Sequence, residues 1–354
     1  MLLHKTFPMS VSFALLLAAL PAAGQSLVMS VPRQSQRAVV SQRIGVTDVT
    51  VTYHRPLVGG RKVWGAMVPY GRVWRAGANE NTVIEFSEPV MVEGKMLARG
   101  AYGLHTIPGA DTWTIIFSKN STSWGSFSYD EKEDALRVTV KPAASEMHEA
   151  LTYDFDDVKA DSAVLTLRWE KLAVPVRVSS DKDATIANIR NQLRNSAQYT
   201  WMGWADAAQW CLDSKINLEE GLKWNDRSIQ MEDRFENEML KSQLLKELKR
   251  DSESATARNK AMELGNAIQV YSFGRSIQIQ GQKPEALEYF RVVAKRFPEH
   301  WLSHLAQARL SVAGGDFATA LREIQAAVAG APAQNKTALE TLQKRIENKE
   351  DING

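Results

Sequence analysis

The residues best suited to chemistry lie in one segment of the chain, between Tyr53 and Thr82. This segment contains four arginines, two tryptophans, an Asn-Glu pair and repeated glycines, and its flanks read as β-strands. Arginine presents a rigid fork of donors to carboxylates, phosphates or carbonyl oxygens, and glycine permits tight turns and close approach of the backbone. The pattern predicts an organised polar loop, but it fixes neither a reaction nor a ligand.

Seven side chains are candidates for ligand binding, and no catalytic residue can be assigned. The candidates are Arg55, Arg61, Trp64, Arg75, Asn79, Glu80 and His105. In such a site the arginines would contact an anionic or sugar-like ligand, and a tryptophan face would stack on it. We expect four of the candidates to converge near Trp64 or Trp74, because the glycines let the loop fold back on itself. These four are Arg61, Arg75, Asn79 and Glu80.

A structural interpretation of the same residues is also open. Buried polar groups need partners, so the arginines would satisfy backbone carbonyls and Glu80 in a long crossover, and the tryptophans would fill the core. A third interpretation is a hydrolase or lyase with Glu80 or His105 as its acid or base. A carboxylate near arginines has a lowered pKa, which suits a base better than an acid.

Familiar catalytic and metal-binding patterns are absent from the sequence. His54, His105 and His148 lie in different segments, and the pair His148-Glu149 is followed four residues later by Thr152, where a metalloprotease helix would need histidine. Ser126 and Ser128 have no local base signature, and there is no phosphate-binding or dinucleotide-binding glycine loop. We therefore expect no metal and no cofactor.

The first 24 residues have the pattern of an export signal. Lys5 precedes an apolar run and a small-residue cleavage site, and the run is too short for a transmembrane helix, which needs about 20 apolar residues. We expect a periplasmic or secreted protein without a lipid anchor or a membrane span. The whole chain of 354 residues carries a formal charge of +2, which argues against a nucleic-acid partner. Cys211 is the one cysteine, so no internal disulfide can form, and we expect it to be buried.

The remaining chain divides into halves of different texture. Residues 25–179 contain about nine or ten short segments rich in β-branched and aromatic residues, separated by turns such as Glu93-Gly94, which predicts an antiparallel β-sandwich. A polar linker is expected at 180–184, and residues 185–350 read as helical.

A 34-residue displacement relates two stretches of the helical half. Gly281, Ala286, Leu287 and Pro298 recur as Gly315, Ala320, Leu321 and Pro332. This pattern resembles the tetratricopeptide repeat, a pair of antiparallel helices with small residues where the helices cross. The expected crossing positions are Gly274, Ala286, Ala308 and Ala320. We predict three or four helix pairs, the first of them packed by Trp201, Trp204, Trp210 and Trp224.

The β half carries a long set of motifs: Tyr53-x-Arg55-Pro56, Gly60-Arg61, Trp64-Gly65, the run from Val68 to Thr82, Gly100-x-Tyr102-x-Leu104, Ile107-Pro108, Trp113-Thr114, Trp124-Gly125 and Trp169-Glu170. Over residues 36–179 the chain resembles domain-of-unknown-function family 2911, found in exported bacterial proteins. The resemblance implies a β-sandwich, sometimes followed by helical repeats, and it implies no activity.

These observations favour a protein that binds rather than catalyses. We expect the helical repeats to present a concave surface to another envelope protein or a peptide, and the polar loop to accept a small anionic or glycan ligand. The alternative is a hydrolase or lyase acting on an anionic or carbohydrate-like envelope substrate.

Overall fold

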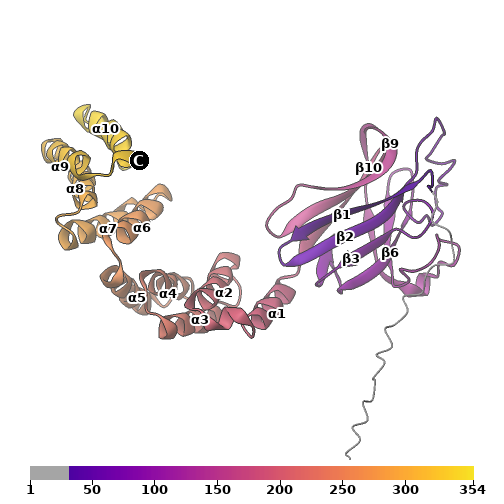
Figure 1. The fold of residues 1–354 in the computed structure, drawn as a ribbon, viewed down its shortest axis with the longest axis horizontal. Coiled ribbons are helices and arrows are strands. Elements are labelled where there is room, and N and C mark those ends of the chain that lie inside the picture. Colours follow the sequence, from indigo (N-terminus) through magenta and orange to yellow (C-terminus); the bar gives the residue numbers. More distant parts are fainter. Residues whose placement is uncertain (1–31) are drawn as a thin grey trace, which may run out of the picture. The chain divides into compact units, whose positions relative to one another are not determined.

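The structure, a computed structural model, describes residues 32–354, so the predicted export signal lies outside the described residues. The chain divides into two compact units, one ending at Ala184 and the other covering Thr185–Gly354. The first unit is built of strands and the second of helices (Figure 1). Each unit is described by itself below.

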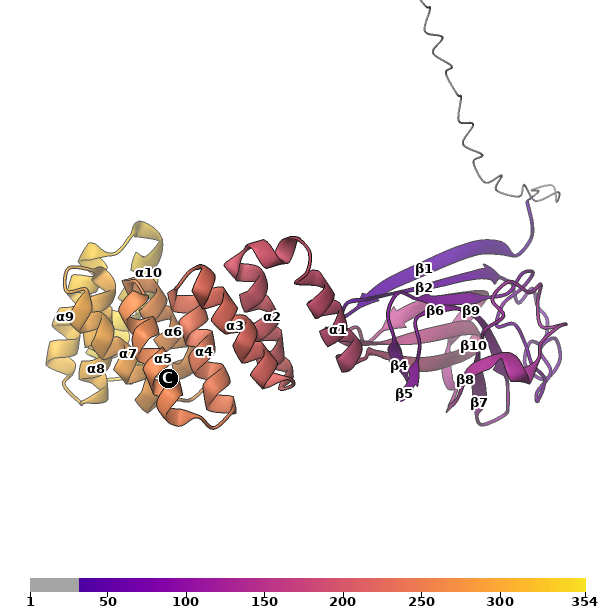
Figure 2. The same ribbon diagram turned by 90° about the horizontal axis from the view of Figure 1, so that it is seen from below.

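The β unit contains two antiparallel sheets, as the sequence predicts (Figure 2). Its strands are β1 (Gln36–Ile44), β2 (Thr47–Arg55), β3 (Val83–Phe86), β4 (Val90–Val92), β5 (Lys95–Leu97), β6 (Gly100–Ile107), β7 (Trp113–Ser118), β8 (Asp134–Val140), β9 (Ala143–Asp156) and β10 (Ser162–Ser180). One sheet has the order β1-β2-β3-β6-β7-β8, and the other has the order β5-β4-β10-β9. The antiparallel sandwich is confirmed.

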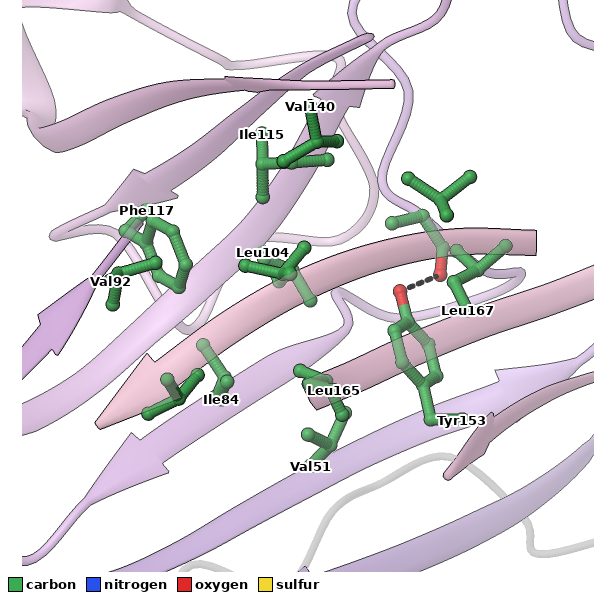
Figure 3. Packing of buried hydrophobic residues seen from close by; sticks show 14 of the residues in the cluster. Val51, Ile84, Val92, Leu104, Ile115, Phe117, Val140, Tyr153, Leu165 and Leu167 are labelled. Atoms are coloured by element: carbon green, nitrogen blue, oxygen red, sulfur yellow. Dashed lines mark hydrogen bonds between the residues drawn. The ribbon is translucent and has the colours of Figure 1, made fainter. Parts of the chain in front are cut away.

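Alternation of side chains explains how the sheets bury their faces. Along β2, Val49, Val51 and Tyr53 are buried, while the residues between them are more exposed. Strands of both sheets supply one apolar core (Figure 3). Tyr153 reaches through this core from β9, and its hydroxyl donates to the backbone oxygen of Ala76, 2.9 Å away (Figure 3). That bond fixes part of the long loop between β2 and β3.

The helical unit consists of ten α-helices within residues 182–354. They are α1 (Lys182–Gln192), α2 (Trp201–Ser214), α3 (Leu218–Met231), α4 (Phe235–Glu247), α5 (Asp251–Leu264), α6 (Ala267–Ile279), α7 (Lys283–Arg296), α8 (Trp301–Ala313), α9 (Phe317–Gly330) and α10 (Ala333–Glu347). Successive helices from α2 to α9 pack as four pairs (Figure 1). This arrangement fits the predicted helical repeat. β10 ends one residue before α1 begins, so most of the expected linker at 180–184 belongs to these two elements.

Small residues lie where the paired helices meet. Ala286, Ala308 and Ala320 are fully buried. At Gly274 an added Cβ would lie 2.7 Å from the Cβ of Tyr289, so α6 and α7 approach too closely there for a larger residue. The 34-residue period thus reflects the spacing of these crossings.

The first helix pair departs from the expectation at one tryptophan. Trp204, Trp210 and Trp224 pack with the apolar cluster of α1–α5, as predicted. Trp201 lies outside that cluster, and the guanidinium of Arg234 sits 5.1 Å from its ring centroid. Its position at the first turn of α2 places it beside the N-terminus of α4, where a charged group can stack on it.

Cys211 is fully buried, as predicted, and burial raises the pKa of its thiol to about 11. Gly221 of α3 faces it, since an added Cβ there would lie 2.8 Å from the Cβ of Cys211. Within residues 32–354, none of the helices combines the length and the hydrophobicity needed to cross a bilayer.

Candidate ligand site on the β unit

Four tryptophans form the floor beneath the polar loop. Trp113 of β7 and Trp169 of β10 are almost completely buried, and Trp64 and Trp74 of the loop pack onto them. Trp74 stacks on Trp169 at a centroid distance of 5.8 Å, and Trp64 meets Trp113 edge-on at 5.0 Å. The two loop tryptophans are partly buried and pack against the core.

The part of the loop after Trp74 is held rigidly. Trp74 and Thr106 of β6 exchange two backbone hydrogen bonds of 2.8 Å. Ala76 is fully buried at a φ of +51°, and its oxygen accepts bonds from Tyr153 and Thr82. A left-handed conformation is unfavourable for alanine and persists only where the surroundings impose it. The loop therefore presents its polar side chains in one fixed arrangement.

Arg55 and Arg61 have structural roles. Arg55 donates from Nε to the oxygen of Leu151, 2.9 Å away, and from Nη2 to Oγ1 of Thr152, 2.8 Å away, so it ties the end of β2 to β9. Arg61 donates from Nε to the oxygen of Val58 within its own turn, 2.9 Å away. Both guanidiniums are satisfied mainly by backbone oxygens, as the structural interpretation expects.

Glu80 is half-exposed, and both of its carboxylate oxygens have a partner. Its Oε1 accepts from Nη1 of Arg33 at 2.8 Å, and its Oε2 lies 3.2 Å from Nε2 of His54. A hydrogen bond from its own backbone and the contact with Arg33 lower the pKa of the carboxyl group. Burial lowers the pKa of His54, although the negative charge of Glu80 opposes that effect.

Asn79, like Glu80, contacts the segment of the chain just before β1. It adopts a left-handed conformation with a φ of +57°. Its Nδ2 donates to the oxygen of Ser35, 3.1 Å away, and so holds the chain just before β1.

Arg75 is different from the other arginines of the segment. Its Nε is buried, and its guanidinium forms neither a hydrogen bond nor an ion pair with any residue among 32–354. Burial lowers the pKa of the guanidinium, and only the more distant charge of Glu80 opposes this. A buried donor without an acceptor costs about 1–3 kcal/mol. The fold therefore carries this arginine at a cost in stability.

Two exposed aromatic rings lie beside Arg75. The guanidinium carbon is 5.7 Å from the ring centroid of Trp124. Trp124 stacks on Phe127 at 5.9 Å with nearly parallel rings, and these side chains are 57% and 83% exposed. Two stacked, exposed aromatic rings form a contiguous apolar patch, and such patches can mark binding sites. Arg75, Trp124 and Phe127 are called the Arg75 platform below.

The loop that carries the two rings is anchored to the polar loop. The backbone nitrogen of Asn81 donates to the oxygen of Ser123 at 3.3 Å, and its Nδ2 donates to the oxygen of Asn120 at 3.3 Å. Both loops therefore contribute to the platform, although the residues that join them are 39 and 42 positions apart in sequence.

His105 lies beneath this second loop. It is 2% exposed, and its Nδ1 is 2.9 Å from Oγ of Ser126. Burial lowers the pKa of the imidazole to about 4, against the opposing charge of Asp134. The sequence contains no local base signature around Ser126, and the fold supplies a histidine partner from β6 instead. This pairing is long-range and leaves no mark in the residues around Ser126.

We expect the β unit to lose stability as the pH falls from about 6.5 toward 4. The folded His105 stays neutral there, because its pKa is about 4, whereas the unfolded chain takes up a proton near its ordinary value of 6.5. The free energy of unfolding should fall by roughly 3 kcal/mol across this interval. Urea titrations at several pH values measure the slope, and His105→Gln should flatten it. An equally steep slope in that variant would contradict the assignment.

The predicted convergence of four residues on one tryptophan is wrong. Arg61 remains in its own turn, and Asn79 and Glu80 face the strand pair β1–β2 through Ser35, Arg33 and His54. Arg75 alone reaches the exposed aromatic rings. The physical reason is that Asn79 and Glu80 have partners just before β1, which are distant in sequence, whereas Arg61 bonds within its own turn.

The sequence reasoning missed Trp124 and Phe127 as site residues. One signal was available: both rings stand in the stretch Ser-Thr-Ser-Trp-Gly-Ser-Phe-Ser, residues 121–128, which has no strand alternation to bury them. An aromatic residue inside a run of serine and glycine has no core to enter.

Comparison with known proteins gives a family for the β unit alone. Residues 35–178 match the family described as "Protein of unknown function (DUF2911)". The β unit belongs to this family. The match covers β1 to β9 and all but the last two residues of β10, including the polar loop and the Arg75 platform, and the family description gives no activity. Among curated proteins no match is found. Among residues 32–354, no cluster of three or more histidine, cysteine, aspartate or glutamate side chains is placed to hold a metal ion.

Proposed function

We propose that this is an exported binding protein: its DUF2911 unit takes an anionic ligand with a flat ring, and its helical unit takes a protein or peptide of the cell envelope. The observation that carries the first part is the unpaired guanidinium of Arg75 beside two exposed rings. Export is inferred from the pattern of residues 1–24 alone.

The chemistry of the platform selects the ligand class. A guanidinium that has already lost much of its water gains more from a carboxylate, phosphate or sulfate than a solvated one does. The stacked pair Trp124 and Phe127 offers an apolar face at the same place, which suits a sugar ring or an aromatic ring. A phosphorylated, sulfated or uronic-acid sugar combines both features, and we propose this class.

The local geometry favours binding over catalysis. The lowered pKa of Glu80 and its pairing with Arg33 and His54 make it a poor proton donor. His105 could accept a proton from Ser126, but its ring is almost completely buried, and its low pKa makes it a weak base. The hydrolase or lyase alternative therefore has less support than the binding role.

The helical unit offers a groove for the proposed protein partner. A cavity of about 640 Å³ runs along α2–α7, with Met239, Phe273 and Tyr289 among its apolar lining and Lys246 and Arg258 among its charged lining. Helical repeats commonly use such concave surfaces for peptides. Co-purification from an envelope fraction is the measurement, and a chain that is recovered alone under native conditions would count against this part.

We expect Arg75→Met to weaken ligand binding strongly without loss of stability. The test is a thermal-shift and calorimetric screen of the full chain against phosphosugars, sulfated sugars and uronic acids. A charged hydrogen bond is worth about 1.5–3 kcal/mol, so affinity should fall roughly 10- to 100-fold. The melting temperature should stay equal or rise slightly, because an unpaired buried donor is removed.

Arg72→Met is the matched control, because it removes the same charge from an exposed position three residues earlier. It should leave affinity within about twofold, since screened surface charges contribute little. Equal affinity of the Arg75 and Arg72 variants for a bound sugar would refute the assignment of Arg75. A panel in which no anionic sugar binds would refute the ligand class.

A further inference from the structure

Residues 350–353, called the return segment here, fold back onto the helical unit after α10. The last helix ends at Glu347, and the chain then turns so that Ile352 is 1% exposed and Asn353 is 5% exposed. Ile352 belongs to the apolar cluster of α4–α10. The chain makes a turn at Ile352 and Asn353, and both side chains are seated among other elements of the helical unit.

The groove recognises Asn353 by both ends of its side-chain amide. Oδ1 accepts from Nε2 of Gln278 in α6 at 2.9 Å, and Nδ2 donates to the backbone oxygen of Arg309 in α8 at 3.1 Å. Both Gln278 and Arg309 are almost completely buried. Pairing a donor and an acceptor at once distinguishes a carboxamide from a carboxylate or an apolar side chain, because either of these would leave a buried group unpaired.

The backbone of the return segment is read by arginines. Arg309 donates from Nη1 to the oxygen of Ile352, while its Nε donates to the hydroxyl of Tyr271 at 2.8 Å. Arg345 donates to the oxygen of Asp351. Arg309 is 4% exposed, and its partners here are neutral oxygens. A buried charge is costly unless its donors are paired, so Arg309 needs an acceptor at the position that the oxygen of Ile352 occupies.

Charge around the groove favours an acidic occupant. Burial lowers the pKa of Arg275, and the neighbouring charges of Arg309 and Arg345 lower it further. Lys283 lies 3.5 Å from Asp351 of the return segment. A cavity of about 200 Å³ adjoins the groove and is lined by Leu287 and Val312 as well as by Asp351 and Asn353. The groove is thus lined by basic side chains, and it includes a partly apolar cavity that the return segment does not fill.

We propose that the groove between α6 and α8 is a recognition site for an acidic–aliphatic–asparagine peptide, and that the return segment occupies it in cis as a competitive pseudo-ligand. The proposal rests on the proposed role of the helical unit as a peptide binder. The partner's peptide places an acidic residue at Lys283, an aliphatic residue in the pocket of Ile352, and an asparagine between Gln278 and Arg309. The partner's peptide can enter the groove between α6 and α8 only when the return segment is displaced from it.

The experiment weakens the intramolecular occupant and offers the peptide in trans. Asn353→Asp in the full chain keeps the size of the side chain but replaces the Nδ2 donor with a charged oxygen that faces the oxygen of Arg309. A fluorescent peptide with the sequence of residues 347–354, blocked at both ends, is titrated against each protein. We expect it to bind the variant at least about tenfold more tightly than the native chain, because the intramolecular competitor has been weakened.

Two controls distinguish recognition of the Asn353 side-chain amide from a general effect of added negative charge. Asn348→Asp makes the same substitution on the exposed residue after α10, and its affinity for the peptide should equal that of the native chain. A peptide carrying the Asn353→Asp change should lose binding at least about tenfold. Equal affinity of all three proteins for both peptides, or no binding by a variant with native circular dichroism, overturns the proposal.

Hydrogen exchange of the native full chain gives a second, independent measurement. If the return segment can detach while α6 and α8 stay folded, the backbone amides of residues 350–353 should exchange at least tenfold faster than those of α6 and α8. Exchange of the segment only together with these helices would make it part of the core and would also overturn the proposal. Capture of an envelope partner by a chain that ignores the peptide would remove this inference and leave the broader role of the helical unit standing.

Discussion

The Trp113→Ala variant is expected to lose about 3–5 kcal/mol of the free energy of unfolding of the β unit. Trp113 is 1% exposed on β7, and its ring contacts Trp64 and Trp74, which anchor the polar loop. Removing the ring leaves a cavity beneath that loop which rigid strands cannot close. Native-state hydrogen exchange of β6 and β7 in the full chain measures the effect.

Trp124→Ala is the matched control for this variant, because it deletes the same side chain from an exposed position in the same unit. Its effect on stability should stay within about 0.5 kcal/mol, while the Arg75 platform loses one of its rings. Similar destabilisation by the two substitutions would mean that the four-tryptophan floor is not the core of the unit.

The Gly274→Leu variant should destabilise the α6–α9 region by roughly 1–3 kcal/mol or more. Even a Cβ would lie 2.7 Å from the Cβ of Tyr289 and 3.2 Å from Cε1 of Phe290, so a leucine has to force α6 and α7 apart. Ala286→Leu, at the same crossing, should act in the same direction because Ala286 is fully buried. Hydrogen exchange of α6–α9 reports the loss, and the strands of the β unit should keep their protection.

Gly330→Ala provides the control for these changes. An added Cβ there would make ordinary contact with Trp301 at 3.4 Å, and alanine is the better helix former by about 1 kcal/mol. It should be neutral or stabilising. If Gly274→Leu were equally harmless, α6 and α7 would not meet through that glycine.

Local patterns made the architecture predictable. The segment Val83–Phe86 is read as a strand from its β-branched and aromatic residues, and it forms β3 with those bounds. The 34-residue displacement of Gly281 and Ala286 onto Gly315 and Ala320 predicts helix pairs, because each repeat needs glycine in its turn and a small residue at its crossing. Both patterns, the strand composition and the repeat of small residues, can be recognised from the order of residues along the chain alone.

The candidate site was less predictable because its contacts are long-range. Glu80 is paired with Arg33, 47 positions away, once β1 and β2 lie together. Ser126 meets His105 only because β6 passes beneath its loop. The polar segment did predict where unusual side chains gather, but which arginine keeps a free guanidinium depends on where every backbone oxygen of the fold lies.

The helical unit has two apolar clusters, and α4 contributes to both. Phe235 and Met239 belong to the cluster of the later helices, whereas Leu244 and Leu245 belong to that of the earlier ones. Under mechanical tension or partial denaturation, the earlier and later helices should therefore yield as separate cooperative blocks, with α4 and its partner α5 as their shared boundary. A partner that stiffened α4 would couple the two blocks, and a mutation that loosened it would let each block unfold alone.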